Sequence, residues 1–80
     1  MLRFSDVLAL RLRLIRLELF ADEGAAKLAS MLGLPCRTWE SYERGVAIPS
    51  EILVQFIVLT HASPLWLLHG IGERFQLCPV

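Results

Sequence analysis

The segment AAKLASMLGLPCRTWESYERG, residues 25–45, holds two short helical patterns separated by a turn. The first pattern predicts a helix over 25–32, with its large apolar residues on one side. Gly33 then supplies the left-handed backbone conformation that commonly ends a helix. Pro35 suits the first turn of the next helix, where its missing N–H is not needed. That second helix is predicted over 36–44, so the segment indicates a helix, a turn and a helix in close succession.

These two helices are able to pack closely because the first has a small residue, Ala29, at the expected contact. The second helix is predicted to stop at Gly45. The residues predicted to fill the space between the helices are apolar or aromatic: Leu28, Leu32, Leu34, Trp39 and Tyr42. Trp39 is therefore interpreted as a core residue and not as a base-stacking aromatic, and Trp66 is also predicted to lie in the core.

The N-terminal segment, 7–20, fits two patterns. Its leucines alternate with alanine or arginine, as in a strand, but one set of apolar residues also has helical spacing: Leu8, Leu12, Ile15 and Leu19. Leu, Arg, Glu and Ala favour a helix, so we predict one, with Ser5 as its N-cap and Asp6 as a first-turn acid. A second apolar stripe lies on nearly the opposite side and consists of Leu10, Leu14 and Leu17. One face would enter the core, and the other needs a partner.

Two further helical patterns follow the quoted segment. Residues 46–50 form a connector, and Ser50 with Glu51 starts a strongly apolar helix. A last short helix is predicted over 64–70, and residues 71–80 show no clear period. No repeat or linker divides the chain, so we predict a single all-α domain spanning residues 1–80.

Taken in order, these features resemble the helix-turn-helix of the lambda-repressor-like family, which includes the Cro-type regulators. Within the motif, at about 25–45, the resemblance rests on Gly33-Leu34 and on the tetrad Tyr42-Glu43-Arg44-Gly45. Outside it, three further segments are similar to the family's first, fourth and fifth helices: Arg13-Leu14-Ile15-Arg16-Leu17, Ile48-Pro49-Ser50 and the stretch SPLWLLHG at 63–70. The junction at 20–24, where Asp22-Glu23-Gly24 breaks the first helix, is longer than usual. The resemblance implies a compact five-helix DNA-binding domain.

The same resemblance makes the helix at 36–44 the recognition helix, which would enter the major groove. Its implied base-reading residues are Cys36, Arg37, Glu40 and Ser41. Arg37 is the strongest of them, because a guanidinium bonds bidentately to guanine. Thr38 and Arg44 are better placed for phosphates, and backbone N–H groups near Ala25 could hold another phosphate at a helix N-terminus. Ala25 departs from the family, which often has a glutamine there whose side chain bonds a phosphate.

The arginines of the N-terminal segment have two possible roles. Arg11, Arg13 and Arg16 could form a basic face toward phosphate, or some of them could serve pairs within the chain. The resemblance implies that Glu43 pairs with a first-helix arginine, for which Arg16 is the best candidate. That pair would be structural.

The overall charge does not favour nucleic-acid binding. The chain has 8 Lys+Arg and 8 Asp+Glu, whereas phosphate contacts usually demand a basic excess. With 55% hydrophobic residues in only 80, the chain is rich in apolar surface for a small monomer, which indicates a partner chain.

Two classes of function follow from these observations. The first is a sequence-specific regulator that binds double-stranded DNA as a homodimer, with 64–80 as the candidate dimerisation segment. The second is a protein-interaction module that keeps the fold and has lost DNA binding. Neutral charge, Ala25 and the second apolar face of the first helix favour the latter.

Other classes of function have little support in the sequence. Cys36 and Cys78 lack metal-ligand spacing and are expected as free thiols in the cytoplasm, although one disulfide is possible. His61 and His69 are predicted at helix ends. No catalytic constellation is found, so we expect no enzyme activity, no cofactor and no small-molecule substrate. Arginines interrupt the apolar N-terminal segment, so no membrane span is predicted.

Overall fold

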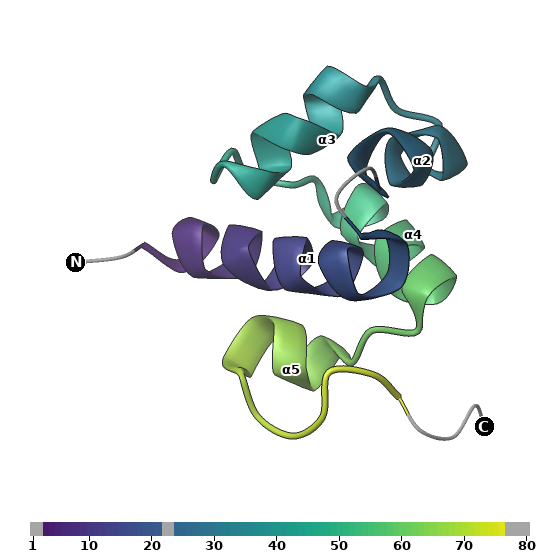
Figure 1. The fold of residues 1–80 in the computed structure, drawn as a ribbon. Coiled ribbons are helices and arrows are strands. Elements are labelled where there is room, and N and C mark those ends of the chain that lie inside the picture. The colour runs from purple at the N-terminus through teal and green to yellow at the C-terminus, as the bar shows by residue number, and fades with distance from the viewer. Residues whose placement is uncertain (1–2, 22–23, 77–80) are drawn as a thin grey trace.

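The computed structural model describes residues 3–21 and 24–76, which form five helices and one isolated antiparallel bridge between Ala62 and Phe75 (Figure 1). The helices are α1 (Phe4–Phe20), α2 (Gly24–Met31), α3 (Cys36–Glu43), α4 (Ser50–Thr60) and α5 (Pro64–His69). The prediction of an all-α domain is therefore confirmed over the described residues. Asp22, Glu23 and the end of the predicted dimerisation segment, 77–80, lie outside them.

Helix α1 is the centre of the arrangement. In Figure 1, α2 and α3 lie on one side of α1, α5 lies on the other, and α4 passes behind. Accordingly, α1 contacts α2, α3 and α5, and α2 also contacts α3. Two eight-residue helices, α2 and α3, are thus joined by the short turn at 32–35 and packed on the same long helix.

Aromatic rings form the middle of the core. Trp39 and Phe56 are fully buried and stack with their ring centroids 5.2 Å apart. Tyr42 meets Trp39 edge-on at 6.1 Å. The prediction that Trp39 and Tyr42 are core residues is confirmed, whereas Trp66 is half-buried and packs against the edge of the core. The tryptophan of α3 therefore ties that helix to α4.

The start of α1 differs from the sequence prediction. Arg3, not Ser5, is the N-cap residue, and the helix begins at Phe4. Asp6 lies in the first turn as expected, where its carboxylate accepts a hydrogen bond of 3.3 Å from the backbone N–H of Arg3. A carboxylate three residues into a helix satisfies a backbone donor there, so Ser5 is not needed as the cap.

The two apolar faces of α1 are present, with two exceptions. Leu8, Leu12 and Ile15 are buried, and Leu10 and Leu14 on the other side are exposed, but Leu17 of that second stripe is half-buried. Leu19, predicted on the core face, is exposed as well, so that prediction is wrong. Two other residues of the last turns face inward: Arg16 is buried, and Phe20 packs against the core.

The turn between α2 and α3 has the geometry that Gly33 was predicted to provide. Gly33 has φ of +73°, and the N–H of Leu34 reaches back to the carbonyl of Ala29 at 2.8 Å. Ala29 is buried at the contact between the helices, as expected. Pro35 lies one position earlier than predicted, as the N-cap residue of α3. Its fixed φ still leads the chain into the helix.

Gly33→Ala is expected to lower the free energy of unfolding by about 1 kcal/mol, because a left-handed backbone is unfavourable for a residue with a Cβ. No atom lies within 4 Å of an added Cβ, so steric overlap contributes nothing. Gly33→Asn is the matched control and should cost less, since asparagine tolerates this conformation. Urea unfolding of both variants measures the difference, and an alanine variant as stable as the parent would contradict the prediction.

The segment after α5 folds back on its own domain. Ser63 and Pro64 start α5, and the Ser63 side chain accepts a hydrogen bond from the backbone N–H of Trp66 at 3.3 Å. The N–H of Ser63 then bonds the carbonyl of Arg74 at 2.8 Å, and the N–H of Gln76 bonds that of His61 at 2.9 Å. As predicted, His61 caps α4 and His69 ends α5.

Candidate nucleic-acid interface

One side of α3 carries polar side chains toward solvent. Arg37 and Glu40 are exposed on the helix, and Arg44 is exposed at its C-cap. These positions are three and four residues apart, so they share one face. The opposite face holds the buried Trp39 and Tyr42. The helix is thus anchored by its aromatic side and presents two arginines and a glutamate outward.

The other predicted residues of α3 are less open. Ser41 is half-buried, and its hydroxyl donates a 2.6 Å hydrogen bond to the carbonyl of Thr38. Its oxygen can still accept a hydrogen bond from a ligand. Thr38 is also half-buried. Cys36, predicted to face solvent, is a half-buried free thiol that packs against the core.

Ala25 stands in the first turn of α2, where phosphate contact was predicted through the backbone. Its side chain is half-buried and packs against the core. The methyl group therefore contributes packing, and any polar contact at this position would come from backbone N–H groups, whose orientation at a helix N-terminus suits an anion.

Arg16, Glu43 and Trp39 form one hydrogen-bonded network between α1 and α3. Arg16 Nε donates to Glu43 Oε2 at 2.7 Å, and Arg16 Nη2 donates to Glu43 Oε1 at 2.9 Å. Arg16 Nη1 also donates to the carbonyl of Ala21 at 3.1 Å, and the indole N–H of Trp39 donates to Glu43 Oε2. The predicted pair of Arg16 with Glu43 is confirmed. Its bidentate geometry fixes the C-terminal end of α3 against α1.

The other two arginines of α1 have separate environments. Arg11 donates from Nη1 to the carbonyl of Leu67 at 3.1 Å, so it binds near the C-terminal end of α5. Arg13 is exposed and lines a shallow polar depression together with Glu40 and Arg44 of the α3 region. The structure thus adds Arg13 to the candidate interface, which the sequence alone left undecided among the three arginines.

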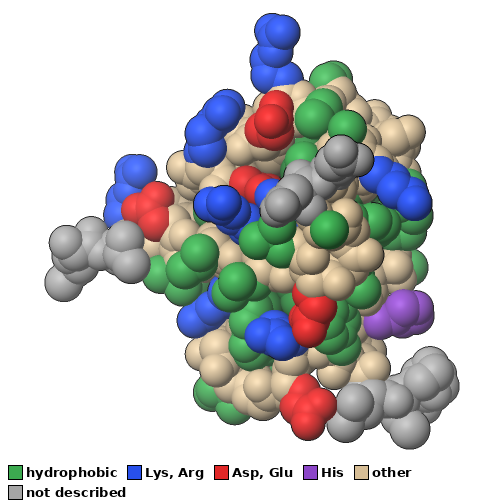
Figure 2. Space-filling view, viewed as in Figure 1, with side chains coloured by type: hydrophobic (Ala, Val, Ile, Leu, Met, Phe, Trp, Pro, Cys, Tyr) green, Lys and Arg blue, Asp and Glu red, His purple; other side chains and the backbone are tan. Residues whose placement is uncertain are grey.

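The surface charge is mixed. Figure 2 shows Lys and Arg side chains interspersed with Asp and Glu side chains on the visible face, where they form no continuous basic patch. Among the described residues around α3, the exposed Arg13, Arg37 and Arg44 accompany one exposed acid, Glu40. Local positive charge at this face therefore exists within a chain of zero formal net charge.

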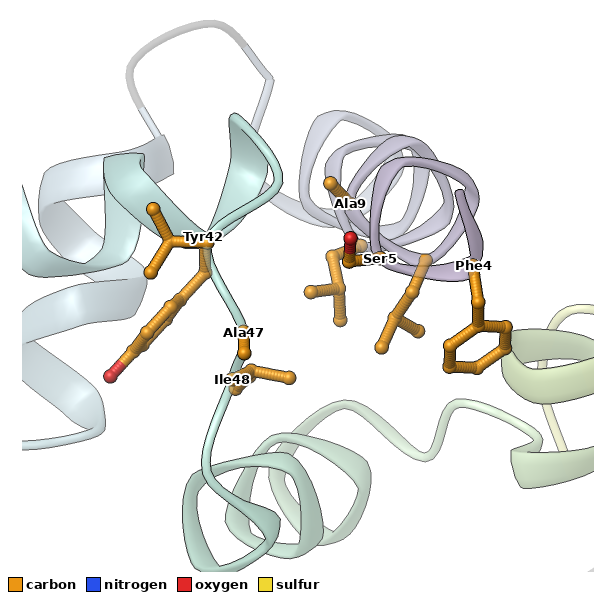
Figure 3. A pocket seen from close by; sticks show the side chains of 9 residues that line it. Phe4, Ser5, Ala9, Tyr42, Ala47 and Ile48 are labelled. Atoms are coloured by element: carbon orange, nitrogen blue, oxygen red, sulfur yellow. The ribbon is translucent and has the colours of Figure 1, made fainter. Parts of the chain in front are cut away.

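A small apolar cavity of about 140 Å³ lies beside α3, between the start of α1 and the connector to α4 (Figure 3). Phe4, Ser5 and Ala9 approach it from α1, and Tyr42, Ala47 and Ile48 approach it from the other side. The lining contains no charged side chain. The cavity therefore offers no charged group with which to orient a ligand.

Neither a candidate metal-binding cluster nor a candidate membrane-spanning helix is present among the described residues. No three His, Cys, Asp or Glu side chains among them are grouped so that they could hold a metal ion. None of the helices in residues 3–21 and 24–76 has the length and apolar character needed to cross a membrane. Compared with known proteins, the chain matches no family model, no curated protein and no solved structure. Its functional interpretation therefore rests on its own side chains.

Proposed function

We propose that this protein is a sequence-specific DNA-binding transcriptional regulator with a lambda-repressor-like helix-turn-helix, which inserts α3 into the major groove as a homodimer. The observation that carries the proposal is the exposed face of α3. It presents Arg37, Glu40 and the adjoining Arg44 to solvent, while Trp39 and Tyr42 anchor the helix from behind. Binding, not catalysis, is the proposed activity.

In this proposal the side chains of α3 divide into two groups. Arg37 reads guanine through two hydrogen bonds, Glu40 accepts from a cytosine amine, and Ser41 bonds either partner. Arg44, Thr38 and the backbone near Ala25 hold phosphates, which set the register of the protein on the duplex. Cys36, half-buried at the start of α3, is the weakest candidate for a base contact.

Arg13 joins the phosphate-binding group. It is exposed and lines the same depression as Glu40 and Arg44. The positive charges of Arg13 and Arg44 offset the negative charge of Glu40, which would otherwise repel a phosphate. This arrangement reduces the difficulty that a chain with no net charge poses for DNA binding.

A protein-interaction module that keeps the fold is the second candidate. It is favoured by the exposed apolar side of α1, with Leu10 and Leu14, and by the apolar side chain of Ala25. The two candidates differ in whether the exposed face of α3 recognises base sequence.

Selection from a randomised duplex-DNA pool at two salt concentrations distinguishes them. For the regulator we expect enrichment of a palindrome whose half-sites are about one helical turn, roughly 34 Å, apart, with binding that weakens as salt rises. A folded sample that enriches no sequence would exclude the regulator and leave the interaction module.

Arg37→Ala and Arg44→Ala are expected to affect the selected DNA differently. Loss of Arg37 should cost about 1–3 kcal/mol of binding and relax the preference at one base pair. Loss of Arg44 should weaken binding to all sequences and lower the salt slope by about one. Arg74→Ala is the matched control, because Arg74 is exposed on the segment after α5, which lies on the other side of α1 from α3 (Figure 1), and it pairs with Glu18 at 3.0 Å. Fluorescence anisotropy measures all three, and equal binding by Arg37→Ala and the parent would contradict the assignment.

A further inference from the structure

The outer side of α4 carries an apolar surface that the proposed DNA contacts do not use. Val54 is 58% exposed and Val58 is 70% exposed, one helical turn apart, and Met31 at the end of α2 is 51% exposed beside them. An open groove runs between these helices, lined by Met31, Leu32, Val54, Gln55, Val58 and Leu59. Clustered exposed apolar side chains of this kind mark interaction sites.

Two pairs of exposed residues, Val54 with Val58 and Glu51 with His61, are placed symmetrically about position 56. We define the α4 surface by its six exposed residues: Met31, Glu51, Val54, Gln55, Val58 and His61. At about 100° per residue, positions 51, 54, 55 and 58 fall within an arc of about 100° on α4. Along α4, Val54 and Val58 lie in the middle of the surface. Glu51 lies in the first turn of the helix, and His61 is its C-cap residue.

This arrangement is complementary to itself. If two copies of α4 pack antiparallel so that Val54 of one copy meets Val58 of the other, Glu51 of each copy lies opposite His61 of the other, because both pairs are centred on residue 56. Within one chain Glu51 and His61 are about 15 Å apart along the helix axis and cannot pair. Antiparallel packing also places opposite ends of the helix dipoles together.

We propose that the α4 surface binds a second copy of this chain through an antiparallel α4–α4 contact about a two-fold axis. The inference specifies the interface of the homodimer in the proposed function, and it rests on that proposal only for the dimeric state. None of the eight residues proposed for DNA contact belongs to the α4 surface, so this contact leaves the exposed face of α3 uncovered in each copy.

The other exposed apolar faces fit a second copy less well. The exposed Leu10 and Leu14 of α1 have two cations as sequence neighbours, Arg11 and Arg13, and the exposed acid of the same helix, Glu18, already pairs with Arg74 within the chain. The predicted dimerisation segment, 64–80, is partly occupied, since its residues Arg74 to Gln76 bond to the chain around α5. Charge complementarity therefore selects α4.

Sedimentation equilibrium of the full chain without DNA tests the surface. Val58→Arg places two guanidinium groups at the centre of the contact and should raise the dimer dissociation constant at least about 30-fold. Leu10→Arg and Ile71→Arg are matched controls at similarly exposed apolar residues and should leave it unchanged. A monomeric parent, or dissociation caused by a control and not by Val58→Arg, would overturn the proposal. Circular dichroism checks that each variant is folded.

Charge exchange tests the register. Glu51→Lys should weaken the dimer roughly fivefold, because each of the two symmetric contacts loses the attraction between the Glu51 carboxylate and the His61 imidazole. His61→Glu should weaken it similarly, and the double variant should restore the parent affinity. Additive weakening in the double variant would overturn this pairing. A dimer that obeys these rules but enriches no DNA sequence would refute the regulator and leave the α4 contact established.

Discussion

Arg16→Met is expected to lower the free energy of unfolding by about 3–5 kcal/mol, the usual effect of removing one partner of a buried ion pair. The Arg16 and Glu43 side chains are only 8% and 10% exposed, and they share two hydrogen bonds. Without Arg16, the Glu43 carboxylate stays in the interior with the Trp39 indole N–H as a donor. One neutral donor does not compensate a desolvated carboxylate.

The double variant Arg16→Met/Glu43→Met is the control for this prediction. Replacing both charges by apolar side chains removes the desolvation penalty, so most of the stability should return. A residual loss of about 1–3 kcal/mol is expected, because the buried indole N–H of Trp39 then loses its acceptor. Urea unfolding followed by circular dichroism measures both variants. A double variant less stable than Arg16→Met would contradict the account.

The size of this effect matters for a chain of 80 residues. Domains of this length have a free energy of unfolding of about 4–12 kcal/mol, so one broken pair removes a large share. The pair also joins α1 to the end of α3, next to Arg44. Any use of α3 as a recognition helix therefore depends on Arg16, which has no place in the groove itself.

The positions of the helices were largely predictable from the sequence, because the residues that start and end a helix act locally. Gly33, Ser63 and Gly70 each act through their own backbone conformation or cap, and each lies where the pattern predicted. Ser5 was wrongly assigned as a cap because Asp6, one residue later, serves the backbone N–H of Arg3 instead. Competing caps within one turn are distinguished only by the three-dimensional geometry.

The inner face of α1 was less predictable, since it depends on tertiary contacts. A charged residue is normally assigned to solvent, so the helical period of α1 grouped Leu19 with the core residues, and only the resemblance paired Arg16 with Glu43. In the structure, Glu43 of α3 draws Arg16 into the interior, and Phe20 packs inward in the next turn. Leu19 is consequently turned outward.

In the candidate site, too, local features were predictable from the sequence and tertiary contacts were not. Arg37 and Glu40 are exposed on α3 as its period predicts, because they lie opposite the buried Trp39 and Tyr42. Arg13 could not be distinguished from its neighbours, since its proximity to Arg44 arises only when α1 packs on α3.

Phe56→Ala is expected to lower the free energy of unfolding by about 3–5 kcal/mol, because it removes a fully buried ring and leaves a cavity. The ring stacks on Trp39 with an interplanar angle of 19°, so the variant separates α4 from α3. Val58→Ala is the control on the outer side of α4 and should change the stability of the monomer by less than about 0.5 kcal/mol.

Urea unfolding at a protein concentration low enough to keep the chain monomeric measures both variants. The near-ultraviolet circular dichroism of Trp39, recorded in a Trp66→Phe background that removes the signal of the other tryptophan, reports the stacking. We expect Phe56→Ala to lose that signal even where helix content persists, since the indole then lacks a fixed neighbour on one face. The two substitutions lie on opposite sides of one helix. The difference between their changes in unfolding free energy therefore reports core packing separately from helix propensity. An equal loss of unfolding free energy in Phe56→Ala and Val58→Ala would contradict the prediction, because it would mean that the inner face of α4 does not hold the helix in place. The packing of α4 on α3, and with it the position of the α4 surface, would then need another explanation.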